Sequence, residues 1–378
     1  MNEISSPIPI LEFGSTHLRL AIYDKLILDR SLFYDKKIEY IRKENKSEQH
    51  PLFDLIVKAE NDIGQHLNEI ILVIDSSTIQ SIDFSIKKNF ENKIITDADI
   101  EYLVNESSQI IQTFNREREI LHVLKSNIFF DDRVVNKYEN ISGEIKNVIV
   151  DLKFITIDKN YINNIKELLL KKHISLKSIY CASFIKSLDL IKKLEISNYI
   201  SFIDIGFKKS SLLIFKDKKL LHLSSINIGG DHITKDVSKV LKLDYRKAEA
   251  EKLKFSRINK INEIDKKKLL KNVINARLEE IIELLFLNST LLKSDKFGNS
   301  LKLYFIGQGS KVLRDNLLSF GSEFNFINEM SIIDENHKDC CESAIKYANY
   351  YGQKQLKKNK ISLENKGFFE RLFEYFSN

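Results

Sequence analysis

An internal repeat is the feature that most constrains the fold of this chain. Near residue 12, apolar strand-forming residues end at Glu12 and turn at Gly14, and near residue 204 they end at Asp204 and turn at Gly206. A shift of 192 residues superposes the two segments and also aligns Leu20-Ala-Ile-Tyr with Leu212-Leu-Ile-Phe. Each copy predicts a strand, a turn and further strands, and a repeat on this scale predicts two related domains. The alternative is that two β-hairpins of common design look alike by chance.

Glycine is scarce, so its positions are informative. The chain has 12 glycines in 378 residues, against roughly 7% in an average protein, and those that remain should mark places where a side chain is not tolerated. Six of them fall in short segments that follow a strand and precede a turn or helix: Gly14, Gly206, Gly229 with Gly230, and Gly307 with Gly309. Backbone amides at such turns form nests for phosphate oxygens.

Two carboxylates stand next to the first two of these turns. Glu12 and Asp204 end the first strand of each repeat and would face the phosphates of a bound ligand. Direct contact between carboxylate and phosphate would be repulsive. A magnesium ion that keeps its waters resolves the repulsion, since it takes few carboxylate ligands. The sequence therefore predicts a phosphate and magnesium site between the two repeats.

The rest of the chain reads as a mixture of strands and helices, which predicts an α/β fold. Expected strands cover 70–74, 79–86, 122–130, 144–157, 178–182 and 301–306, and expected helices cover 97–115, 160–171, 183–193 and 338–355. Residues 231–292 are expected to be mainly helical, with a polar loop near 256–265.

Composition excludes several classes of protein. Hydrophobic residues make up 43% and charged residues 30% of the chain, as in soluble globular proteins. No apolar stretch is long enough to span a bilayer, the first residues do not resemble a signal peptide, and the protein is expected to stay in the cytoplasm. The three cysteines form no CxxC pair, so neither zinc nor redox chemistry is indicated. The net charge of +6 is spread over the chain without a basic, aromatic stripe, so no nucleic-acid partner is expected.

The last residues have the pattern of a membrane-binding helix. Residues 353–366 form a lysine-rich polar linker, and residues 367–378 read GFFERLFEYFSN. Such a helix would be about 18 Å long, too short to span a bilayer but suited to lie in its interface. The alternative is a final helix that docks on its own domain. The apolar residues expected on one helical face are Phe368, Phe369, Leu372, Phe373 and Phe376.

Three stretches resemble a known family. They are similar to the bacterial cell-division FtsA family, and they read GGDHITKDV at 229–237, KAEAEK at 247–252 and Leu121-His122-Val123. The order of the glycine turns looks like the wider actin, hexokinase and Hsp70 superfamily. The resemblance implies an α/β, actin-like (ribonuclease H-like) duplicated bilobed fold. It also implies an inserted 1C-type, SHS2-like subdomain and a C-terminal amphipathic helix.

The same resemblance implies a division into subdomains. These are 1A at 1–75 and 159–198, a 1C-type subdomain at 76–158, 2A at 199–235 and 300–352 (with a closing helix), a helical 2B at 236–299, the basic linker 353–366 and the membrane helix 367–378.

ATP and magnesium are the cofactors that the resemblance implies. The residues expected to hold the nucleotide are Glu12, Gly14, Ser15, Thr16, Asp204, Gly206, Lys209, Gly229, Gly230, Asp231, Glu249, Lys252, Gly307, Gly309 and Ser310, with Glu12 and Asp204 holding magnesium through water. Glu249 and Lys252 share one helix face and would flank the ribose and base. Their alternative role is a solvated helical ion pair.

The chain departs from the family pattern within the expected site. Glu12 stands where the family usually has Asp, Phe207-Lys208-Lys209 replaces further glycines and a hydroxyl residue, and Gln308 replaces a glycine. Side chains there would hinder close approach of the backbone to phosphate, although Lys208 or Lys209 could add positive charge. Nothing in the sequence identifies a base or a water-positioning residue, which phosphoryl transfer needs. We expect altered nucleotide affinity and negligible hydrolysis, and the sequence leaves open whether the protein is an enzyme.

The resemblance implies a division scaffold on the inner face of the cytoplasmic membrane at midcell. Its implied partners are the C-terminal peptide of the tubulin-like protein FtsZ, further copies of the chain, other division proteins on the 1C-type subdomain, and the lipid surface. Lys271 and Arg277 could meet the acidic peptide, although each residue taken alone is more typical of ordinary surface charge. A small-molecule kinase of the same superfamily and a PilM-like pilus assembly protein are the alternatives.

Overall fold

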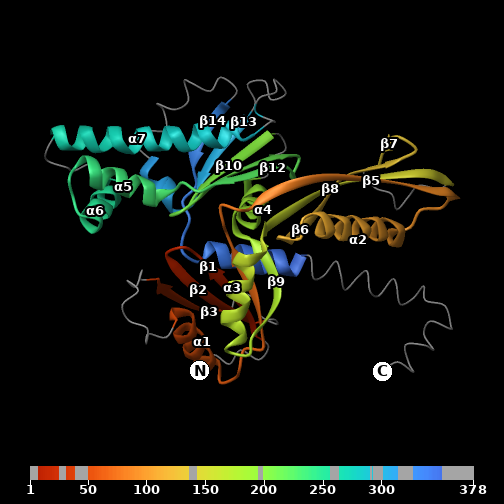
Figure 1. Ribbon diagram of the computed structural model, residues 1–378, viewed down its shortest axis with the longest axis horizontal. Coiled ribbons are helices and arrows are strands. Elements are labelled where there is room, and N and C mark those ends of the chain that lie inside the picture. Colours follow the sequence, from red (N-terminus) through yellow and green to blue (C-terminus); the bar gives the residue numbers. More distant parts are fainter. Residues whose placement is uncertain are drawn as a thin grey trace.

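The computed structural model describes residues 7–24, 31–38, 50–135, 143–194, 199–255, 264–289, 292, 301–313 and 327–350. Figure 1 shows two lobes, each built on a sheet, and an arm that projects from one side. We call the sheet of β1 to β4 and β9 the first lobe, the sheet of β10 to β14 the second lobe, and the sheet of β5 to β8 the arm.

The first lobe is a five-stranded mixed sheet with helices packed on it. Its strands lie in the order β3-β2-β1-β4-β9. Its elements are β1 (Pro7–Phe13), β2 (His17–Asp24), β3 (Ser31–Lys37), α1 (Pro51–Ile63), β4 (Glu69–Ile74), α3 (Lys159–Leu170), β9 (Ser175–Cys181) and α4 (Ala182–Leu194).

The second lobe repeats this sheet. Its strands lie in the order β12-β11-β10-β13-β14, and α5, α6 and α7 cover one face (Figure 1). Its elements are β10 (Tyr199–Ile205), β11 (Ser210–Lys216), β12 (Lys219–Ile226), α5 (Gly230–Val240), α6 (Tyr245–Phe255), α7 (Ile264–Leu287), β13 (Leu301–Ile306), a 3-10 turn η2 (Gln308–Leu313) and β14 (Ile327–Ile332).

The duplication predicted from the sequence is confirmed down to the strand register. In the first lobe Glu12 pairs across the hairpin with Arg19, and in the second lobe Asp204 pairs with Ser211. Both pairs are related by the same shift of 192 residues. In each lobe the first strand also runs parallel to the fourth in spatial order, β1 beside β4 and β10 beside β13. The two carboxylates therefore occupy equivalent places in two equivalent sheets.

The arm is a separate small layer of one sheet and one helix. Its strands are β5 (Gln80–Lys93), β6 (Arg118–Phe130), β7 (Arg133–Val134) and β8 (Ile145–Asp158), in the order β5-β8-β6-β7. Helix α2 (Asp97–Phe114) packs on this sheet around its own apolar cluster. A reciprocal capping box between Thr96 and Asp99 satisfies the first amides of the helix and fixes its start.

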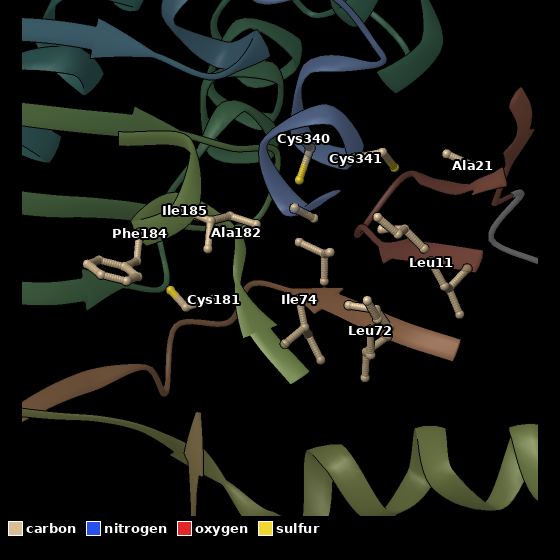
Figure 2. Packing of buried hydrophobic residues seen from close by; sticks show 14 of the residues in the cluster. Leu11, Ala21, Leu72, Ile74, Cys181, Ala182, Phe184, Ile185, Cys340 and Cys341 are labelled. Atoms are coloured by element: carbon tan, nitrogen blue, oxygen red, sulfur yellow. The ribbon is translucent and has the colours of Figure 1, made fainter. Parts of the chain in front are cut away.

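One apolar cluster joins the two lobes. It contains residues from the first sheet, from one face of the second sheet, from α4, and from the helix at 339–350. Figure 2 shows Cys340 and Cys341 of that last helix on the side of the cluster opposite Leu72 of the first sheet. All three cysteines are buried and free, so they act as small apolar residues in this cluster.

Helix α1, the two-residue strand β7 and strand β14 were not predicted from the sequence. Helix α1 begins with Pro51, the Nδ1 of His50 accepts from the Leu52 amide, and the helix ends at Gly64 in the left-handed conformation. Strand β14 is a half-exposed edge strand, so its side chains lack the buried pattern that indicates a strand. The described helices include none that is long and apolar enough to cross a membrane.

Candidate functional site

The two hairpin turns that follow Glu12 and Asp204 close in the same way. The amide of Gly14 donates to the His17 carbonyl at 3.0 Å, and the amide of Gly206 donates to the Lys209 carbonyl at 2.9 Å. The expected phosphate residues Ser15 and Thr16 lie inside the first turn. The two turns are thus structurally equivalent, as the repeat predicts.

The start of helix α5 packs directly on the second turn. A β-carbon added to Gly229 would lie 2.6 Å from the Gly206 oxygen and 2.8 Å from the Phe207 oxygen, so this position excludes any side chain. The amide of Gly230 donates to the Gly206 carbonyl at 2.9 Å, and that of Asp231 donates to the Phe207 carbonyl at 2.7 Å. These two helix-start amides therefore bind the protein's own backbone, although the sequence predicted that they would face phosphate.

The third glycine turn lies against the end of strand β10. Gly307 has a φ of +86°, and a β-carbon there would be 2.4 Å from Oδ1 of Asp204. Gly309 lies against Ile205 and the Gly206 carbonyl in the same way. The hydroxyl of Ser310 donates back to the Gly307 carbonyl at 2.7 Å. The structure thus brings the predicted residues of the second lobe together at one edge of the sheet.

Lys252 ties helix α6 to the start of helix α5. Its Nζ donates to the Gly230 carbonyl at 2.9 Å and contacts the Thr234 hydroxyl at 2.8 Å, and it pairs with Glu249 at 2.7 Å. The Thr234 hydroxyl also donates to Glu249. The lysine side chain is only 6% exposed, so the pair is not the solvated helical ion pair considered above. Burial lowers the pKa of Lys252 in spite of the neighbouring carboxylate.

Asp231 is bound by side chains of its own lobe. It accepts from the Tyr245 hydroxyl at 2.6 Å and pairs with Lys235 one helical turn later at 2.7 Å. Burial opposes its charge, but these two partners lower the pKa of Asp231 below its usual value. Asp231 therefore stabilises the contact between α5 and α6.

Glu12, the carboxylate of the first repeat, is paired with a guanidinium. Arg19 Nη1 lies 2.8 Å from Glu12 Oε1, and Arg19 also reaches Asp35 at 3.5 Å. Burial raises the pKa of Glu12 more than Arg19 and Lys186 lower it. The other oxygen, Oε2, is buried without a hydrogen-bond partner.

A buried lysine that was not predicted from the sequence holds the carboxylate of the second repeat. Lys186 Nζ of helix α4 lies 3.1 Å from Asp204 Oδ2 and 3.1 Å from Glu335 Oε1, and all three side chains are at most 10% exposed. Burial opposes the charge of Asp204, but Lys186 and Lys209 lower its pKa. Burial raises the pKa of Glu335 to about 6 even beside Lys186.

A second lysine makes the opposite connection between the lobes. Lys209, in the second turn, lies 2.5 Å from Asp75 Oδ2 and 2.5 Å from the Ser211 hydroxyl. Asp75 directly follows strand β4 of the first lobe. Lys209, expected to face phosphate, thus bridges to the first lobe. The sequence signals for this network were an acid at the end of a buried strand (Asp75) and a lysine within the apolar face of a helix (Lys186).

The geometry does not fit the magnesium site expected from the sequence. Glu12 and Asp204 are each bonded to a protein cation, and Oδ1 of Asp204 faces the backbone of Gly307. Magnesium needs octahedral space for its waters. Among the residues that the structure describes, no three His, Cys, Asp or Glu side chains are grouped so that they could hold a metal ion.

The two basic residues expected to meet a partner peptide differ in their surroundings. Arg277 of α7 binds Asp236 of α5 through two nitrogens, at 2.6 and 3.0 Å, and pairs with Glu280 at 2.5 Å. Lys271 lies exposed on the same helix. Arg277 therefore holds two helices together, and Lys271 is the more accessible charge. The linker and the expected membrane residues, Phe368, Phe369, Leu372, Phe373 and Phe376, lie outside the described residues.

Comparison with known proteins identifies the relationship of the second lobe. Residues 201–359 match the family model of cell division protein FtsA. Over these residues the chain is similar to FtsA. It is 21% identical to the FtsA of Agrobacterium fabrum over 248 residues, which cover 60% of this chain and 55% of that protein. It is 23% identical to the FtsA of Helicobacter pylori over 141 residues, 37% of this chain and 28% of that protein. The matched segment therefore spans about half of the Agrobacterium protein.

Solved structures show the fold. A chain of the PilM-PilN type IV pilus biogenesis complex superposes with a TM-score of 0.58 at 15% identity, covering 86% of this chain and 88% of that one. MreB 5 of Spiroplasma citri bound to AMPPNP superposes with a TM-score of 0.50 at 13% identity, covering 94% and 99%. The actin-like, duplicated bilobed fold is thus confirmed, and at these identities the likeness concerns the fold alone.

Proposed function

We propose that this chain is a cell-division scaffold of the FtsA kind. It would polymerise on the inner face of the cytoplasmic membrane, bind FtsZ and hold the Z ring there. The observation that carries this proposal is the match of residues 201–359 to the FtsA family model, on an actin-like duplicated body. Weak attachment of each copy would be sufficient, because a polymer multiplies the contacts.

ATP would bind between the lobes and control assembly. The supporting geometry is the pair of equivalent turns at Gly14 and Gly206 and the third turn at Gly307, which is packed at the same strand end as Asp204. Because the first amides of α5 bind the second turn, phosphate would be held by the hairpin turns rather than by that helix. Hydrolysis would be negligible, since the sequence pattern identifies no base or water-positioning residue for phosphoryl transfer.

Partner contacts would be divided among the subdomains. The FtsZ peptide would dock on the helical subdomain, proposed as 236–299, where exposed Lys271 offers charge to an acidic segment. The arm, proposed as the 1C-type subdomain at 76–158, would mediate self-association and contact other division proteins. Residues 367–378 would lie in the lipid interface, with the lysines of 353–366 attracted to anionic lipid.

A PilM-like role in pilus assembly is the second candidate. The observation that favours it is the TM-score of 0.58 with the PilM-PilN complex, above that of the MreB 5 structure. A PilM-like protein would need a pilus partner, whereas a division scaffold needs FtsZ. The two candidates therefore differ in the partner that they bind and in their place in the cell.

A fluorescent fusion at native level, imaged together with labelled FtsZ, tests the proposal. A band at midcell that disappears on FtsZ depletion is the expected result, and a diffuse or polar signal would contradict it. In parallel, the purified chain is titrated with the FtsZ C-terminal peptide. Lys271→Glu should weaken binding roughly tenfold, about 1.4 kcal/mol, while Lys247→Glu, another exposed lysine of the second lobe, should leave it unchanged. Vesicle co-sedimentation with and without 367–378 tests the membrane contact.

A further inference from the structure

We infer that Lys186 takes the place of the divalent cation in this site, so that the chain binds its phosphorylated ligand without a metal ion. This inference rests on the proposed nucleotide site and goes beyond it, because it names the form of the ligand. It replaces the magnesium site that Glu12 and Asp204 suggested in the sequence with a metal-free one.

The position of Lys186 follows from the way helix α4 is buried. The helix starts at Ala182, directly after strand β9, and residues 182–187 are all buried. Lys186 lies one turn into the helix, on the side that meets the second lobe. From there its Nζ is 3.1 Å from both Asp204 and Glu335. One ammonium group is therefore shared by two buried carboxylates.

Each lobe contributes a lysine that pairs with carboxylates of the other lobe. Lys186 of the first lobe meets Asp204 and Glu335 of the second, and Lys209 of the second lobe meets Asp75 of the first at 2.5 Å. A bound divalent ion would neutralise the carboxylates beside the phosphates and would link the two lobes. Here two lysine ammonium groups neutralise the carboxylates and link the lobes.

Space also favours lysine over a hydrated metal ion. Asp204 is only 5% exposed, its Oδ2 is occupied by Lys186, and its Oδ1 lies against the Gly307 backbone. Magnesium binds at about 2.0–2.1 Å and keeps several waters. A hydrated ion would have to displace both Lys186 and the third glycine turn. An ammonium group needs neither change, because it bonds directly to the carboxylates.

Binding of Mn²⁺ to the full chain, followed by electron paramagnetic resonance, tests the inference without using nucleotide. Wild-type protein should bind Mn²⁺ no more tightly than weak protein cation sites, about 0.1–1 mM. Lys186→Met keeps the volume of the side chain but removes its charge. It should tighten Mn²⁺ binding roughly tenfold or more, because Asp204 and Glu335 then lack a cation. Lys193→Met, on the same helix but 55% exposed, should behave as wild type.

Each outcome bears on the inference. A wild-type site that binds Mn²⁺ tightly would overturn it even if Lys186→Met did not fold. Failure of a folded Lys186→Met variant to gain affinity would overturn it as well. If the wild type binds no nucleotide but Lys186→Met gains Mn²⁺ affinity, the replacement of the metal by lysine stands and the proposed nucleotide function fails. The two ideas are therefore tested separately.

Discussion

Asp204 and Glu12 occupy equivalent places in the two lobes, but their charges are balanced in different ways. Glu12 is bonded at 2.8 Å to Arg19, its own cross-strand neighbour, whereas Asp204 is bonded at 3.1 Å to Lys186 from the other lobe. One carboxylate is therefore satisfied within its hairpin, and the other helps to connect the lobes. The same duplicated scaffold thus carries a local ion pair on one side and a bridging ion pair on the other.

The close approach of α5 to the second turn predicts different effects at adjacent glycines. Gly229→Ala should lower the free energy of unfolding by about 2–3 kcal/mol, since the new methyl group meets backbone oxygens at 2.6 and 2.8 Å. Gly230→Ala should change it by less than about 1 kcal/mol, because its nearest neighbour is the end of the Lys252 side chain at 3.5 Å. Urea unfolding measures both variants, and equal losses would contradict the proposed packing.

The pair of Lys209 and Asp75 predicts a strong coupling between the lobes. Lys209→Met leaves the largely buried Asp75 without its cation and should cost about 3 kcal/mol. Lys209→Met combined with Asp75→Asn should recover a large part of that loss, since no charge is then left unpaired. A double-mutant cycle in urea gives the coupling energy. Strictly additive losses would show that the two residues do not interact.

Arg277 predicts an effect on stability rather than only on partner binding. Its guanidinium holds Asp236 of α5 through two nitrogens, so Arg277→Ala should destabilise the chain by about 1–2 kcal/mol. Lys271→Ala, at an exposed position of the same helix, should stay within about 0.5 kcal/mol of wild type. Thermal unfolding of the two variants compares them directly, and an unchanged Arg277→Ala protein would refute the role of the pair.

Because His122 is buried, we expect the free energy of unfolding to fall in acid. This residue lies in β6 of the arm, accepts from the Cys181 amide at 2.9 Å and contacts the Tyr347 hydroxyl at 3.0 Å. Burial lowers its pKa to about 3, from 6.5 for a free histidine. Between these values the unfolded chain binds more protons than the folded one, so stability falls as pH falls below 6.5. This residue should contribute a loss of about 1.4 kcal/mol between pH 7.5 and 5.5.

Comparison with His122→Gln isolates this contribution, because other titrating groups remain in both proteins. The amide oxygen of glutamine can still accept from Cys181 but does not titrate. The difference in unfolding free energy between the two proteins should shrink or change sign as the pH falls. A difference that stays constant from pH 7.5 to 5.5 would contradict a buried neutral histidine.

Much of the fold could be predicted from the sequence because the repeat leaves a strong local pattern. The apolar strands that end at Glu12 and Asp204 and the retained glycines at 206, 229 and 307 mark positions that the structure brings to a strand end or turn. Strand β14 was missed because an edge strand with half-exposed side chains has no clear period.

The ion pairs of the site could not be predicted for a different reason. Lys186 and Glu335 are far apart in the sequence, and so are Asp75 and Lys209. Only the packing of the two lobes against each other brings these charges together. A lysine inside an apolar helix face is a weak signal, because such side chains usually extend to solvent. The prediction of a magnesium site considered only Glu12 and Asp204, and each of these is bonded to a protein cation in the structure.

Calorimetric titration of the full chain with ATP, in magnesium and again in EDTA, tests the central claim most directly. The account predicts one ATP per chain, with a dissociation constant that changes by less than about twofold when the metal is removed. Binding that requires magnesium, or no binding in either buffer, would contradict a metal-free nucleotide site between the lobes.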